Sequence, residues 1–268
     1  MKIQPAVSLW NYNHYHPAPH LEELLVLLRK HDFGVELWNA WQGDEDLYQK
    51  KSWTRIKNAL EGMRVSLHST IGIQELDAHR RQIEAAAAFD AQVLVIHADN
   101  LYHPGSKRLN LPLTRQLVEE AAAAGVTLAL ENGQLPVLAR AVEEVPDLKI
   151  CLDTGHVYLV QETMAEFLDA FRDRIVHLHL QEILASHEQH LVGEGGIILD
   201  HYTPGTGGIL EEDWHLLFRT LEEIDFQGMG VFEIQPRNPL QTAELGSRFM
   251  EKILDDLALP GLNPPAGS

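Results

Sequence analysis

Short apolar segments recur along the chain, and most of them end in an acidic residue or a histidine. Their content of Val, Ile and Leu is typical of strands buried on both faces of a parallel sheet. Strands are predicted over residues 3–9, 34–37, 64–68, 93–97, 126–131, 149–153, 175–180 and 229–234. The polar groups that end these segments are His68, His97, Glu131, Asp153, His179 and Glu233. Such a group is costly at the end of a buried strand unless it meets a metal, a partner or a ligand. We therefore expect the strand ends to converge on one site.

Helical patterns lie between the predicted strands. Apolar residues recur at helical spacing over 20–31, 77–89, 113–124, 165–171 and 214–224. Gly125 is placed to end the third of these helices. Strands alternating with helices in this way favour a single (β/α)8 TIM barrel. The alternative, an open doubly wound sheet, needs a glycine-rich phosphate loop after its first strand, and residues 8–16 contain no glycine.

The domain organisation follows from this alternation. The barrel is predicted over residues 1–258, with a Pro/Gly-rich tail over 259–268. A chain of this length is ordinary for a one-domain α/β barrel. The long segment 181–208, rich in His and Gly, follows the seventh strand, and long loops inside a compact domain are usually functional or disordered. Part of it, HEQHLVGEGG (187–196), could form a lid over a substrate.

Composition and charge exclude several classes of binding partner. The formal net charge of −18 would repel a phosphate backbone, so no nucleic-acid partner is expected. No apolar stretch approaches the roughly 18 residues that a membrane span needs, so no membrane partner is expected either. Cys151 is the only cysteine, which excludes an intrachain disulfide and a Cys-based zinc site and favours the reducing cytoplasm. The oligomeric state is left open, a homo-oligomer included.

Four of the strand-end residues form a candidate metal site. In a TIM barrel the active site lies at the C-terminal ends of the strands. If these ends point inward, Glu131, Asp153, His179 and Glu233 line one half of the mouth. Three carboxylates and one imidazole suit a divalent ion such as Mn²⁺, Mg²⁺, Co²⁺ or Zn²⁺. Without a cation, the clustered carboxylates would raise one another's pKa. His177 shares the face of His179 and could lie behind the ligands.

Motifs along nearly the whole chain resemble those of the xylose isomerase-like TIM barrels. They are ALEN (129–132), CLDTGH (151–156), HLHLQE (177–182), PGTGGI (204–209) and FEIQP (232–236). That superfamily holds sugar isomerases and epimerases, inosose-processing enzymes and endonuclease IV. The resemblance to the epimerases implies metal ligands at Glu131, Asp153, His179 and Glu233. It also implies that His156 contacts the substrate or a second metal.

The resemblance implies a reaction as well. An isomerase or epimerase acting on a sugar or cyclitol removes a proton from the carbon beside a carbonyl, and a divalent ion stabilises the enediolate. Glu131 and Glu233 would be the catalytic carboxylates, each facing one side of the substrate, while Asp153 and His179 would only hold the metal. A dehydratase acting through the same enediolate would share this site. No basic cluster marks a phosphate pocket, so the small-molecule carbohydrate substrate is expected to be unphosphorylated.

The remaining histidines support an alternative, a multinuclear zinc phosphoesterase related to endonuclease IV. The positions of His68, His97, His156 and His201 match those that hold extra zinc ions there. The match breaks at Leu199, where that enzyme has a metal-binding aspartate, and the acid here is Asp200. Sugar-branch members keep such histidines for substrate hydroxyls, so both readings stay open.

Other residues have a functional and a structural interpretation. Glu36, in the second strand, is either a contact to substrate or second metal, or a member of a structural ion pair. Trp10, Trp38 and Trp41 could form an apolar wall for a sugar, although packing is the commoner role. A group of N-terminal histidines, His14, His16 and His20, is interpreted as a solvent-facing loop.

Overall fold

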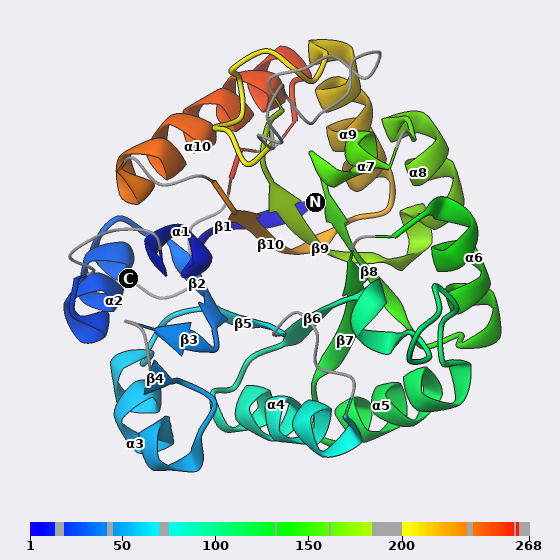
Figure 1. Cartoon of the computed structure of the whole chain (residues 1–268). Helices are drawn as coiled ribbons and strands as arrows, with labels where there is room; N and C mark the ends of the chain where they lie inside the picture. Colours follow the sequence, from blue (N-terminus) through cyan, green and yellow to red (C-terminus); the bar gives the residue numbers. More distant parts are fainter. Residues whose placement is uncertain are drawn as a thin grey trace, which may run out of the picture.

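The computed structural model describes residues 1–13, 19–41, 45–69, 75–131, 133–160, 162–183, 200–234, 238–259 and 261–262. Its main strands close into one parallel barrel in the order β1-β10-β9-β8-β7-β6-β5-β2, seen along its axis in Figure 1. Their bounds are β1 Lys2–Ser8, β2 Gly34–Trp38, β5 Val65–His68, β6 Val93–His97, β7 Thr127–Glu131, β8 Lys149–Asp153, β9 Ile175–Leu180 and β10 Gln227–Phe232. The predicted (β/α)8 barrel is confirmed, because the first strand pairs with the last.

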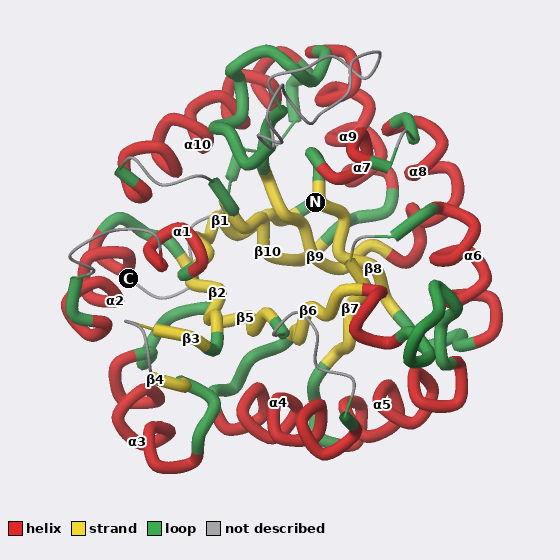
Figure 2. The backbone as a smooth tube through the Cα atoms, viewed as in Figure 1, coloured by secondary structure: helices red, strands yellow, loops and turns green. Residues whose placement is uncertain are grey.

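Helices surround the barrel on all sides (Figure 2). The outer ring consists of α2 Leu21–Lys30, α3 Lys50–Ala59, α4 Leu76–Ala88, α5 Leu111–Ala123, α6 Leu135–Glu144, α8 Met164–Phe171, α9 Glu211–Glu223 and α10 Pro239–Asp256. Shorter elements are α1 Trp10–Asn13, α7 His156–Leu159, the 3-10 turns η1 Ala98–Leu101 and η2 Arg172–Arg174, and the antiparallel pair β3 Ala40–Trp41 and β4 Glu45–Asp46. Within the described ranges, no helix is both long and apolar enough to cross a membrane.

Local sequence signals start and end several of these helices. Asn110 caps α5 by accepting a hydrogen bond from the Leu113 amide, and Gly125 follows that helix with a φ of 76°. Thr163 and Glu166 form a reciprocal capping box at the start of α8. The left-handed backbone at Gly125 explains why a glycine ends α5, as the sequence predicted.

Three helices of the outer ring were not predicted by pattern. The sequence of α3 is mostly polar, whereas α6 has a clear apolar face, with Leu135, Leu138 and Val142 against the core, that was not predicted. In α10 the apolar pattern is interrupted by Gly246, which lies against Phe232. A Cβ at Gly246 would come within 2.7 Å of the Phe232 ring, so close packing of α10 on the barrel requires this glycine. The last strand also ends two residues before the predicted boundary, which leaves Glu233 just beyond β10.

The inside of the barrel is filled in layers. Small apolar side chains from alternate strand positions occupy the lower part of the barrel, namely Val93, Val95, Ala129, Cys151, Ala6, Met229 and Val231. Two residues further along the same strands stand His97, Glu131, Asp153 and Glu233. Because side chains alternate between the two faces of a strand, these polar groups share the inward face with the small residues. The lower layer thus supports a polar layer at the C-terminal mouth.

The predicted tail lies only partly within the described residues. Leu259 and Leu262 pack against the core of the barrel, so the start of this segment covers apolar surface. The domain boundary at residue 258 stays a prediction.

Candidate metal centre and active site

Strand register brings the predicted metal ligands together. His97 on β6 stands beside Glu131 on β7, and Asp153 on β8 stands beside His179 on β9. One ligand atom from each of four residues lies within 4.8 Å of the others, and all four residues are buried: Glu131, Asp153, His179 and Glu233. These four residues are called the metal cluster below.

His179 lies at the centre of the metal cluster. Its Nδ1 is 3.1 Å from Glu131 Oε1, 3.3 Å from Glu233 Oε2 and 3.8 Å from Asp153 Oδ2. Burial alone would lower the pKa of His179, but the surrounding groups, Cys151, Glu36 and Glu131 foremost, hold it well above its ordinary value. A single nitrogen therefore faces all three carboxylates of the cluster.

Imidazoles also surround Glu131. Its Oε2 is 3.0 Å from His68 Nε2 and 3.0 Å from His97 Nε2, and its Oε1 is 3.7 Å from His156 Nδ1. Burial would raise the pKa of this carboxyl, yet the charges of His179 and His97 hold it well below its usual range. Glu131 is thus ionised, and each of its oxygens meets a histidine.

Asp153 is oriented by the turn that follows β8. The backbone amides of Gly155 and His156 each donate to its Oδ1 at 2.9 Å, and Gln181 Nε2 donates to both oxygens at 2.8 Å. A Cβ at residue 155 would lie 2.5 Å from Gln181 Oε1, which explains the glycine in CLDTGH. Burial raises the pKa of Asp153. Sequence reasoning did not single out Gln181, although its position two residues after His179 puts it on the same face of the chain.

A second polar group, made of His156, Asp200 and His201, lies next to the metal cluster. Asp200 Oδ2 is 3.2 Å from His201 Nδ1 and 3.4 Å from His156 Nε2, while His156 Nδ1 is 3.3 Å from Asp153 Oδ2. His201 has a φ of 58°, uncommon for a residue with a side chain, and its amide donates to Gln181 Oε1 at 2.6 Å. Burial would lower the pKa of His201, but contacts with Asp200 and Glu233 raise it to about 9.

The sequence pattern indicated Asp200 only as a departure from the endonuclease pattern. The structure places its carboxylate against both His156 and His201. Its position next to the loop histidine was the available signal. All the predicted site histidines, His68, His97, His156 and His201, lie at this mouth.

Glu36 lies beneath the metal cluster. Its Oε2 is 3.0 Å from His177 Nε2 and its Oε1 is 3.0 Å from His179 Nε2, and the residue is fully buried. Of the two roles considered from sequence, these contacts agree with membership of an ion pair. A role in contacting substrate stays a prediction.

Two tryptophans border the site. The ring centre of Trp38 is 4.5 Å from that of His68, and the ring centre of Trp10 is 4.6 Å from that of His201. Trp38 and Trp10 are partly exposed, whereas Trp41 is 2% exposed and packs in the core. Trp10 and Trp38 therefore offer apolar surface beside the cluster, and Trp41 is a packing residue.

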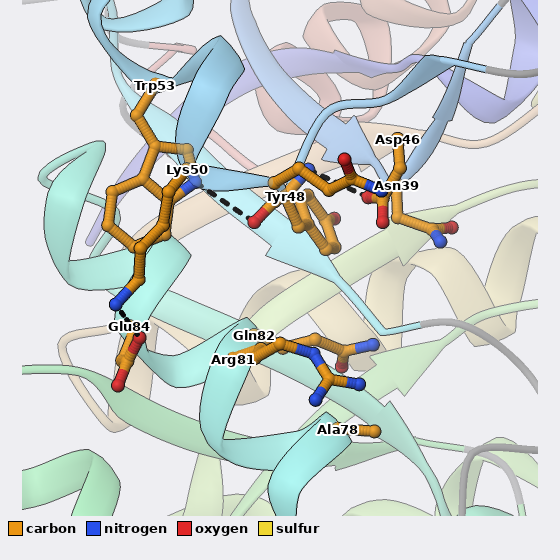
Figure 3. A pocket seen from close by; sticks show the side chains of 10 residues that line it. Asn39, Asp46, Tyr48, Lys50, Trp53, Ala78, Arg81, Gln82 and Glu84 are labelled. Carbon is orange, nitrogen blue, oxygen red and sulfur yellow. Dashed lines mark hydrogen bonds and ion pairs between the residues drawn. The ribbon is translucent and has the colours of Figure 1, made fainter.

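A separate hollow of about 410 Å³ lies outside the barrel mouth (Figure 3). Its lining includes Asn39, Asp46, Tyr48, Lys50, Trp53, Arg81, Gln82 and Glu84. Lys50 pairs with Glu84 across it at 2.9 Å. Tyr48 separates the hollow from the site, with its hydroxyl 2.7 Å from the Leu37 carbonyl oxygen and 2.6 Å from that of His68. The metal cluster does not line this hollow, so the buried charges, rather than the shape of the surface, mark the site.

Several predicted features lie outside the described residues. They are His14, His16, Asn132, Leu199, the segment 187–196 and residues 235–236 of FEIQP.

The chain was also compared with known proteins. Residues 16–253 match the profile of the family described as xylose isomerase-like TIM barrel. The chain belongs to this family. The predicted superfamily resemblance is thereby confirmed.

Individual relatives agree with this assignment. An inosose dehydratase from Histophilus somni (strain 129Pt) is 27% identical over 258 residues, which covers 85% of this chain and 80% of that protein. A D-tagatose 3-epimerase-like protein superposes with a TM-score of 0.69 at 16% identity, covering 95% of this chain and 100% of that one. The IolI protein, solved with a zinc atom, superposes with a TM-score of 0.68 at 15% identity, covering 95% of this chain and 98% of that one. The prediction that the chain is an enzyme is confirmed.

The cluster fits a divalent cation. Bonds of about 2.0 to 2.3 Å to an ion place its ligand atoms roughly 3 to 4 Å apart. The contacts of His179 Nδ1 with the three carboxylates, 3.1 to 3.8 Å, fall in this range. Oxygen and imidazole donors suit Mn²⁺, Mg²⁺, Co²⁺ or Zn²⁺. A further group at the surface consists of Glu211, His215 and Asp256, and both of its carboxylates are already paired with Lys252.

Removing a ligand should remove the metal. We expect Asp153→Ala and His179→Ala to lower the metal content of the purified protein several-fold or more, because each removes one of four donors. His215→Ala, in the surface group, is the control and should keep full content. Elemental analysis measures all three variants, and unchanged content in both cluster variants would disprove the ligand assignment.

Metal binding should release protons. His179 can ligate through Nδ1 only when that nitrogen has lost its proton, and the raised pKa keeps the metal-free ring protonated over much of the neutral range. Affinity should therefore fall about tenfold for each pH unit below that pKa, for one displaced proton. Isothermal titration calorimetry in buffers of different ionisation enthalpy counts the protons. An affinity that stays constant between about pH 6 and pH 8 would contradict this expectation.

Proposed function

We propose that this chain is a divalent-metal-dependent isomerase or epimerase that acts on a sugar or cyclitol by moving a proton at the carbon beside a carbonyl. A dehydratase that begins with the same proton abstraction shares the proposal. The observation that carries it is the meeting of two buried glutamates from different strands, Glu131 and Glu233, at one nitrogen of His179.

The two glutamates supply the acid and base chemistry. Both carboxyls have a pKa held well below its usual range: in each case burial would raise it, and the charge of His179 outweighs this effect. An ionised carboxylate on each side of a bound substrate can take a proton from one face and return it to the other. A cation bound at the cluster would hold the carbonyl and the neighbouring hydroxyl and stabilise the negative charge of the enediolate.

The surroundings of the two carboxylates differ. Glu131 Oε2 lies between two imidazoles at 3.0 Å, while Glu233 Oε1 has a hydroxyl, Ser8 Oγ, at 3.5 Å. Glu233 also keeps a small exposure of 4%, whereas Glu131 has none, at 0%. We therefore assign the first proton abstraction to Glu233, the less constrained of the two. Glu131, held by its histidines, would act on the opposite face.

The character of the substrate rests on the site and on the relatives together. The relative from Histophilus somni is an inosose dehydratase, and one structural neighbour is a D-tagatose 3-epimerase-like protein; inososes and tagatose are both polyhydroxylated ketones. Trp10 and Trp38 would offer apolar faces to the C–H groups of such a ring or chain. A cytoplasmic location and the oligomeric state stay predictions.

One observation favours a second candidate, a multinuclear zinc phosphoesterase. Beside the metal cluster lie two further groups with ligand chemistry. In the first group, His68 and His97 both contact Glu131. In the second group, Asp200 contacts His156 and His201, and His156 also contacts Asp153. Several ions bound there would activate water for phosphoester hydrolysis. The net charge of −18 favours the isomerase over a nuclease, because it opposes binding of a polyanion.

The number of bound ions separates the two candidates. We expect about one Mn, Mg, Co or Zn per chain in protein purified without added metal or chelator, because one four-donor cluster is complete. Elemental analysis with quantitative protein determination gives the ratio. Two or three zinc ions per chain, together with turnover of a phosphodiester, would favour the phosphoesterase.

Loss of either glutamate should abolish turnover. We expect Glu131→Gln and Glu233→Gln to lower kcat by about 100- to 10,000-fold, since each removes a proton-transfer group. The assay is hydrogen exchange from solvent into ketoses, aldoses and inososes, followed by NMR in D₂O. Glu119→Gln, on the exposed side of α5, is the matched control and should retain full activity. Near-normal activity of either site variant on a substrate of the wild type would refute the two-carboxylate mechanism.

A further inference from the structure

Glu36 is a buried carboxylate that the proposed reaction does not use. It lies on β2 and is 0% exposed. Its parallel register partner on β5, Ser66, donates from Oγ to Oε2 at 3.0 Å. His177 Nε2 lies 3.0 Å from the same oxygen. A buried carboxyl in this position is costly without partners, and Ser66 and His177 are two of them.

The contact of Glu36 with His179 crosses the barrel. The strands β2 and β9 are not neighbours in the sheet, since β1 and β10 lie between them on the shorter path. Glu36 Oε1 nevertheless lies 3.0 Å from His179 Nε2. The contact is an ion pair by distance and is not aligned as a hydrogen bond: within the described residues, neither of these two atoms has a well-aligned hydrogen-bond partner. The two groups are thus close enough to pair, and a rotation of either side chain would align them.

The two ring nitrogens of His179 face different groups. Nδ1 lies 3.1 to 3.8 Å from the three carboxylates of the metal cluster, and Nε2 lies 3.0 Å from Glu36 Oε1. A histidine that ligates a metal must be neutral, with its proton on the nitrogen away from the ion. That proton then faces Glu36 Oε1, which lies 3.0 Å from Nε2.

We propose that Glu36 is the positioning residue of the metal centre: it accepts the Nε2 proton of His179 and so directs the Nδ1 lone pair to the ion. Ser66 and His177 hold the carboxylate in place from below. Such a carboxylate behind a ligating histidine fixes the ring and makes its ligating nitrogen more basic. This inference rests on the metal centre of the proposed function. In this role Glu36 acts on a metal ligand, His179, and does not contact the substrate.

Metal affinity distinguishes this role from that of a plain structural ion pair. We expect Glu36→Gln to raise the Kd for Zn²⁺ by about 10- to 100-fold, measured by competition with a chromophoric chelator. Gln4→Leu is the control: Gln4 is another fully buried polar residue of the barrel, on β1, and should leave the Kd unchanged. The unfolding midpoint of each metal-free variant is recorded alongside.

The outcomes separate this inference from the proposed function. If wild type binds Zn²⁺ and Glu36→Gln binds it within twofold of wild type, the positioning role is overturned while the metal centre stands. A loss of metal-free stability with unchanged affinity would identify a structural ion pair. If wild type takes up no metal, both proposals fail.

Two measurements keep the test valid if Glu36→Gln does not fold. Ser66→Ala removes one hydrogen bond to Glu36 and should raise the Kd about two- to tenfold. In the Zn²⁺-loaded wild type, ¹⁵N–¹H correlation spectra report the tautomer of His179. A proton on Nε2 is expected, and a proton on Nδ1 would overturn the proposal.

Discussion

Buried negative charge governs the C-terminal end of this barrel. Four carboxylates stand within its upper layer almost without access to water: Glu36, Glu131, Asp153 and Glu233. Removing an ion from water costs several kcal/mol, on the order of magnitude usual for buried charges, unless partners compensate for it. Here the compensation comes from imidazoles on facing strands, with His179 in contact with all four acids. Closure of the barrel and assembly of the site are thus one event, because the pairs exist only when distant strands face one another.

The same charges explain why the site is suited to a cation. In its absence, protons on the histidines balance the carboxylates, and the pKa of His179 is raised accordingly. A divalent ion can take over this balance and free the imidazole to ligate. The turn after β8 adds a fixed element, since two backbone amides and Gln181 hold Asp153 whether or not an ion is bound. Only part of the cluster therefore has to adjust on binding.

Function in this family depends on what surrounds a common centre. In the proposed function, the metal cluster serves proton abstraction beside a carbonyl, and the outcome depends on which groups can protonate the enediolate or assist a leaving hydroxyl. Asp200, His156 and His201 stand at one side of the cluster, and His68 and His97 stand at the other. These flanking groups could orient hydroxyls or hold further ions, and this difference separates the isomerase from the phosphoesterase.

The sequence by itself determined the barrel and the members of its metal cluster. Period-two alternation places Glu131 and Asp153 above the small residues Ala129 and Cys151 on the inward face, and parallel strands bring their ends to one mouth. Local patterns did not reveal α3, whose sequence is mostly polar, because packing against the barrel stabilises it. The sequence also did not predict which side chains meet across the barrel. Whether Glu36 meets a substrate or His179, and whether Asp200 reaches His156, depends on strand tilt and loop path. Only the tertiary structure decided these contacts, because spacing along one strand says nothing about which side chains meet across a closed barrel.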